Sequence, residues 1–164
     1  MTIKFTYNDG GRKSAGYKGD AGDCVVRAIA IATEFPYRQV YKDLQGEIAE
    51  AIVYGRKSKL RSSLVHEAAM GRVSPRNGVH KKLFHAYLIG LGWQWIPTMS
   101  IGSGCTVHLR AEELPAGRIV ASVSKHLVAV IDGAINDTYD PSRDGTRCVY
   151  GYYGLAGEQQ REED

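Results

Sequence analysis

A cysteine, a histidine and an aspartate in this chain have the residue types of a thiol nucleophile, a general base and an orienting carboxylate. They are Cys24, His126 and Asp140. A thiolate is the nucleophilic form of cysteine, and a histidine near it can take up its proton. A carboxylate fixes the histidine tautomer and stabilises its charged form. Whether the three residues act together depends on the elements that carry them.

Cys24 is predicted to lie on the first turn of a buried helix. A glycine-rich approach ends at Asp23, a good N-cap residue, and a long apolar run follows from Val25. Unpaired N–H groups and the helix dipole at this end favour a thiolate over a thiol. We therefore interpret Cys24 as a candidate nucleophile. The alternative is that it fills space as a small buried hydrophobic residue.

His126 and Asp140 are predicted to lie at the two ends of a β-hairpin. Apolar runs at 126–131 and 134–139 are joined by Asp132-Gly133. Asp-Gly between two such runs is the strongest short-range hairpin signal. The hairpin would bring the start of its first strand beside the end of its second. The sequence therefore predicts a histidine within reach of a carboxylate.

Two carboxylates compete for this position. In a strict two-residue hairpin Asp137 falls on the same face as His126, whereas Asp140 needs a bulge or a twist to join it. Asp140 could instead cap the turn at Pro141-Ser142. His126 itself could be an ordinary strand histidine.

The hydrophobic pattern divides the chain into an N-terminal helical part and a C-terminal part made of strands, which indicates an α+β fold. We expect one domain over 1–157 and an acidic, frayed tail over 158–164. The predicted helices are 24–35, 37–53 and 79–91, and the predicted strands are 2–7, 93–97, 105–109, 118–123, 126–131, 134–139 and 147–153.

Composition limits the classes of function. The chain has 164 residues, 43% of them apolar, and a net charge of +3, which is too small to argue for nucleic acid binding. No apolar run is long enough for a membrane helix, and the first residues lack the apolar core of a signal peptide. Three cysteines are few and odd in number, which does not suit a disulfide framework. We therefore expect a cytoplasmic protein, where a catalytic thiol would stay reduced.

Cofactor and metal sites are not indicated. No Gly-Lys-Ser/Thr follows a strand, so nucleotide binding is unsupported. His80 and His85 are five residues apart, not the four that would place two ligands on one helical face. Cys105, Cys148 and His108 complete no second triad, and the two cysteines are interpreted as structural.

The arrangement of these residues resembles that of papain-like cysteine peptidases. Gly22-Asp23-Cys24 opening an apolar helix looks like their nucleophile segment. The later His126-Leu127-Val128-Ala129-Val130, followed by Asp-Gly and Tyr139-Asp140-Pro141-Ser142, is similar to segments of bacteriocin-processing peptidases and transglutaminase-like enzymes. Josephin-type and ubiquitin C-terminal hydrolase-type deubiquitinases share the same logic.

The resemblance implies a fold, a reaction and a choice between the two aspartates. The fold would be a helical part led by the cysteine helix and packed on an antiparallel sheet. The reaction would be hydrolysis of a peptide or isopeptide bond through a triad of Cys24, His126 and Asp140. Asp140 is preferred over Asp137 because its Tyr-Asp-Pro-Ser context matches the family.

The chain departs from the family pattern before the cysteine. Papain-like enzymes carry a glutamine five or six residues earlier, whose amide helps to form the oxyanion hole, whereas this chain has Lys18 and Gly19 there. The hole would need the Cys24 backbone N–H and a second donor such as Lys18 or a loop amide. Two alternatives therefore stay open: an acyl transferase of transglutaminase type, and a catalytically silent binding module.

Two segments are candidates for specificity. The glycine-rich loop 10–23 is either a mobile connection or a backbone that passes close to a substrate. The basic segment 56–76 is either a solvated loop or a docking surface for an acidic partner or nucleic acid, of which the acidic partner is preferred. The expected partner is a protein or peptide substrate, with no membrane and no cofactor. A compact enzyme of this kind would suit a bacterium or a phage.

Overall fold

The computed structural model describes residues 3–19, 21–57 and 73–157 as a mixed α+β fold. The basic segment 56–76 and the acidic tail 158–164 therefore fall largely or wholly outside the described residues. Among those residues the helices are α1 (Cys24–Thr33), α2 (Tyr37–Lys57), α4 (Lys81–Gly90) and the short 3-10 helix η1 (Ala111–Glu113), and the strands are β1 (Lys4–Tyr7), β2 (Trp93–Pro97), β3 (Arg118–Val123), β4 (His126–Ile131), β5 (Ala134–Asp137) and β6 (Gly151–Leu155).

The six strands form one sheet in the order β1-β5-β4-β3-β6-β2. The hairpin between β4 and β5 has the expected two-residue turn, because Ile131 pairs with Ala134. All neighbouring pairs are antiparallel except β1 and β5, which run parallel. The resemblance implied an antiparallel sheet. This expectation is correct only in part, because the N-terminal strand β1 is an edge strand that runs parallel to its neighbour β5.

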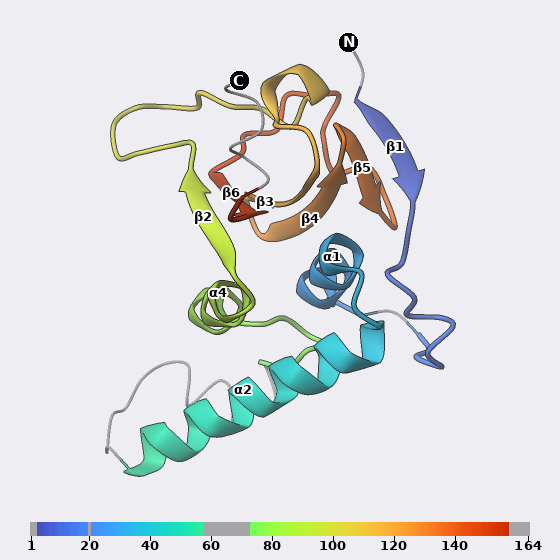
Figure 1. The fold of residues 1–164 in the computed structure, drawn as a ribbon, viewed down its shortest axis with the longest axis vertical. Coiled ribbons are helices and arrows are strands. Elements are labelled where there is room, and N and C mark those ends of the chain that lie inside the picture. The colour runs from blue at the N-terminus through green and yellow to red at the C-terminus, as the bar shows by residue number, and fades with distance from the viewer. Residues whose placement is uncertain (1–2, 20, 58–72, 158–164) are drawn as a thin grey trace.

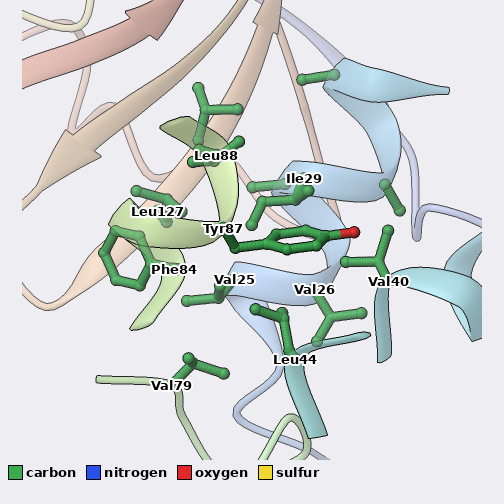
Figure 2. Close-up of a cluster of buried hydrophobic side chains, with 14 of the residues drawn as sticks. Val25, Val26, Ile29, Val40, Leu44, Val79, Phe84, Tyr87, Leu88 and Leu127 are labelled. Carbon is green, nitrogen blue, oxygen red and sulfur yellow. The ribbon is translucent and has the colours of Figure 1, made fainter. Parts of the chain in front are cut away.

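The helices cover one face of the sheet. Helix α1 packs on β4, α4 lies beside α1 and packs against the edge strand β2, and α2 lies on the side of these two helices that is away from the sheet (Figure 1). Apolar side chains from this helical layer and from the inner face of the sheet form one core. Figure 2 shows part of it, where Ile29 of α1, Leu44 of α2 and Leu88 of α4 gather in one cluster. Each is fully buried, and burial of such a side chain contributes about 1.5–3 kcal/mol.

The opposite face of the sheet is covered by loops rather than by helices. Its core contains Val128 and Ile135 of the central strands and Leu109, Leu114 and Val149 of the connecting segments. This packing explains why 105–109 does not form the predicted strand. The structure gives it only a single bridge between His108 and Cys148.

Cys105 and Cys148 form a disulfide. The expectation that three cysteines would not support a disulfide is therefore wrong. The bridge ties two loops on the face away from the helices, where neither partner lies in a regular strand. It leaves Cys24 as the free cysteine of the chain.

Other predicted elements are confirmed within a few residues. The strand predicted at 93–97 is the edge strand β2, and 118–123 is the interior strand β3. The last strand begins at Gly151 rather than at 147. In the described part of the chain, none of the helices has both the length and the hydrophobicity to span a bilayer.

Candidate active site

Cys24 is the first residue of α1, as predicted. The residues that follow it, from Val25 to Ala32, are all buried, so the helix is anchored along its length. Asp23 occupies the N-cap position, but its side chain makes no cap hydrogen bond. The N–H groups of the first turn are therefore not used by this carboxylate, and they point toward the end of the helix that carries the thiol.

The thiol of Cys24 is paired with His126. Burial raises the pKa of Cys24, but a hydrogen bond with His126 and the positive charge of that histidine lower it, and the Leu127 N–H and the Arg27 charge act in the same direction. The pKa of Cys24 therefore ends below its ordinary value. The distant strand β4 has brought the imidazole to the helix end, as the sequence predicted.

His126 is held by Asp137. Its Nε2 lies 2.7 Å from Asp137 Oδ2, and both side chains are almost completely buried. Burial lowers the pKa of His126, but its hydrogen bonds with Asp137 and with Cys24 and their charges raise the pKa to about 9. Because Nε2 is engaged with Asp137, we infer that Nδ1 faces the thiol. Tyr139 Oη also approaches Nδ1, at 3.3 Å.

The expectation that Asp140 is the partner of His126 is wrong. The structure pairs the histidine with Asp137, and Asp140 Oδ1 instead accepts a hydrogen bond from the Ser142 N–H at 2.9 Å. The cause is the strict two-residue hairpin, which has no bulge between Ile131 and the end of β5. The side chain of Asp137 therefore lies on the same face of the sheet as that of His126. Asp140 lies three residues beyond the end of β5 and caps the next turn.

A buried arginine connects Asp137 to the start of α1. Arg27 Nη2 lies 3.3 Å from Asp137 Oδ1, and its Nη1 donates to Asp23 Oδ1. Asp23 is 1% exposed and also accepts from Tyr37 Oη at 2.5 Å, while Arg12 Nε lies 3.2 Å from its Oδ2. The cation between two buried carboxylates offsets their desolvation and fixes the position of Asp137.

The sequence analysis did not assign a role to Arg27, although a signal was present. It is the one charged residue in the ten-residue segment 24–33, and a charge in a buried helix needs a partner. Asp23 is four residues earlier, which places the two side chains on one face of the helix. The position of Tyr139 near His126 also had a signal in the sequence. If the hairpin register that pairs Ile131 with Ala134 is extended, Tyr139 lies opposite His126.

Arg27→Met should lower the free energy of unfolding by about 2–4 kcal/mol, because the substitution leaves two buried carboxylates without their shared cation. Urea denaturation followed by circular dichroism measures the change. Tyr37→Phe is the control, since it removes a single hydrogen bond to Asp23 and should cost about 1 kcal/mol. Equal losses in the two variants would argue against a bridging role for Arg27.

A pocket of about 570 Å³ opens beside Cys24 and His126. Gly22 of the glycine-rich loop lines it, and a Cβ on this residue would lie 3.3 Å from the backbone oxygen of Asn77. This end of the loop therefore forms part of the pocket wall and packs closely against Asn77. Lys18 does not line the pocket, and its backbone oxygen accepts from Arg12 and Arg76.

Comparison of the chain with protein-family models, with curated proteins and with solved structures found no match. The function is therefore argued from the geometry alone. In the described part of the chain, no group of three His, Cys, Asp or Glu side chains is arranged to hold a metal ion.

Proposed function

We propose that the chain is a papain-like thiol hydrolase that cleaves a peptide or isopeptide bond. The single observation that carries the proposal is the pairing of Cys24 at a helix start with a buried histidine that a carboxylate orients. A structural cysteine needs no base, whereas a nucleophilic thiol needs one held in the correct tautomer. An open pocket beside the thiol gives a substrate access to it.

The proposed reaction proceeds through an acyl-enzyme. The thiolate of Cys24 attacks the substrate carbonyl carbon, and the C=O electron pair moves to the oxygen. When the tetrahedral intermediate collapses, the C–N bond breaks and the leaving amine takes the proton of His126. His126 then accepts a proton from a water molecule whose oxygen attacks the thioester carbon. When this second tetrahedral intermediate collapses, the C–S bond breaks, the acid leaves, and the thiolate of Cys24 and the protonated His126 are restored. Asp137 stabilises the imidazolium in both half-reactions.

The oxyanion in this proposal is stabilised by the start of α1 and by a residue across the pocket. The Cys24 backbone N–H belongs to the first helical turn, which the Asp23 side chain does not cap. Asn77 lines the same pocket, and its side-chain amide is a donor of the same type as the glutamine that papain-like enzymes use. Asn77 therefore replaces Lys18 as the proposed second donor.

Hydrolysis should show a bell-shaped dependence on pH. The acidic limb reports formation of the Cys24 thiolate, and it is moved to lower pH because His126 lowers the pKa of this thiol from its ordinary value. The basic limb reports loss of the His126 proton, which the pair holds until about pH 9. Because the two groups titrate together, both limbs belong to the pair.

The test is cleavage of a peptide library, followed by mass spectrometry at a series of pH values. We expect new peptide termini, produced by the wild-type protein and not by Cys24→Ala. An added primary amine separates hydrolysis from acyl transfer, since transfer would give amide products. Absence of both products across the library, with Cys24 reduced, would contradict the proposal and favour a silent binding module.

Location in the cytoplasm is also a proposal. It is favoured by the need of Cys24 to stay reduced, whereas disulfides such as Cys105–Cys148 persist mainly in oxidising compartments. Thiol labelling of the protein in intact cells distinguishes a reducing compartment from an oxidising one. Three labelled cysteines would agree with a cytoplasmic protein, and one labelled cysteine would point to an oxidising compartment.

A further inference from the structure

The pocket beside Cys24 has apolar walls. Buried side chains of Val25, Val79, Phe84 and Leu127 line it. Val25 belongs to α1, Val79 and Phe84 belong to α4 and the residues just before it, and Leu127 belongs to β4. Figure 2 shows the four side chains on one side of the hydrophobic cluster. A pocket with such walls beside a nucleophile favours a substrate side chain that is itself apolar.

Two lysines line the same pocket. Lys81 is the first residue of α4, and its Nζ lies 5.1 Å from the centre of the Trp95 ring. Lys125 lies in the turn between β3 and β4, directly before His126, with a left-handed φ of 55°. The two lysines thus come from different parts of the fold and line one cavity.

Among the residues that the structure describes, none neutralises these two charges. No described residue that lines the pocket is an aspartate or a glutamate, and neither lysine forms an ion pair with a described residue. Arg27 also lines the pocket, but the charges of Arg27 and Arg12 together are matched by those of Asp23 and Asp137. The thiolate and the imidazolium offset each other. The pocket therefore has a net positive charge that an anionic substrate group would complement.

We propose that the pocket selects acidic peptides, in which a large apolar side chain enters the pocket and a neighbouring aspartate or glutamate pairs with Lys81 and Lys125. The inference rests on the proposed function, because it names the substrate class of that site. A peptide with lysine or arginine in place of the acidic residue would meet two like charges.

The charge selection is tested without peptide turnover by alkylating Cys24 with iodoacetate and with iodoacetamide, which differ in charge. The variant is Lys81→Gln/Lys125→Asn, in which asparagine suits the left-handed backbone. Lys82→Gln is the control, because Lys82 neighbours Lys81 in α4 but does not line the pocket. The ratio of the iodoacetate rate to the iodoacetamide rate should fall about threefold or more in the double variant and stay unchanged in the control.

The same ratio should fall in the wild-type protein as salt is added, since the lysines are open to solvent screening. A ratio that is equal in the wild-type protein and the double variant would overturn the charge selection. The second arm compares kcat/KM for peptides with an acidic, neutral or basic residue beside an apolar one. Cleavage without an acidic preference would overturn this inference alone, whereas no cleavage would overturn the proposed function and leave the alkylation ratio to decide the charge selection.

Discussion

His126→Ala should reduce kcat/KM for peptide cleavage by about 10⁴-fold or more, close to the loss produced by Cys24→Ala. Without the imidazole the thiol keeps the pKa increase caused by burial and loses the hydrogen bond and the charge that lower it. The leaving amine also loses its proton donor. Both half-reactions then depend on the same missing group, so the two variants should be equally inactive.

The loss should not come from unfolding. His126 lies at the first position of β4, and its side chain lines the pocket and belongs to neither hydrophobic core, so its truncation should leave the sheet intact. Circular dichroism and urea unfolding verify this for each variant. The double variant Cys24→Ala/His126→Ala should be no worse than either single one, because residues that act as a unit are not additive. Independent, multiplying losses would contradict a shared role.

Asp137→Ala should lower kcat/KM by about 10²- to 10⁴-fold, whereas Asp140→Ala should change it less than about threefold. Asp137 accepts the hydrogen bond of His126 Nε2, and together with Cys24 it raises the pKa of that ring. Asp140 accepts from the Ser142 backbone, so its loss should appear as about 1 kcal/mol of stability rather than as lost activity.

Asp137→Asn is the second variant for this prediction. The amide has the size of the carboxylate, so no cavity forms beside Arg27. Its carbonyl can still accept from His126, but it has no charge to stabilise the imidazolium. We expect the basic limb of the pH profile to move below about pH 9, since the pKa of His126 loses one of its two charge partners. Larger activity loss in Asp140→Ala than in Asp137→Asn would contradict this assignment.

The sequence predicted the parts of the site that local patterns encode. An N-cap residue before an apolar run located the start of α1 at Cys24, and Asp132-Gly133 located the hairpin that carries His126. Such signals are local, since they depend on the backbone preferences of a few neighbouring residues. The meeting of these two distant elements was inferred from their chemistry and is present in the structure.

One error came from setting aside a local signal, and the others came from features that neighbouring residues do not determine. The register of the hairpin favoured Asp137, but the Tyr-Asp-Pro-Ser context directed the choice to Asp140. Arg27, which bridges Asp23 and Asp137, is 110 positions from Asp137 in the sequence. The disulfide and the parallel pairing of β1 likewise depend on how loops and termini pack, which hydrophobic periodicity does not report.

The central claim is that His126 lowers the pKa of the Cys24 thiol, and the pH dependence of iodoacetamide alkylation tests it most directly. Cys24 is the free cysteine, so the adduct is unambiguous. In the wild-type protein the rate should rise with an inflection below about pH 8.5, and in His126→Ala the inflection should move to about 8.5 or above, with a rate at about pH 7 that is at least tenfold lower. Superimposable curves for the two proteins would contradict the account.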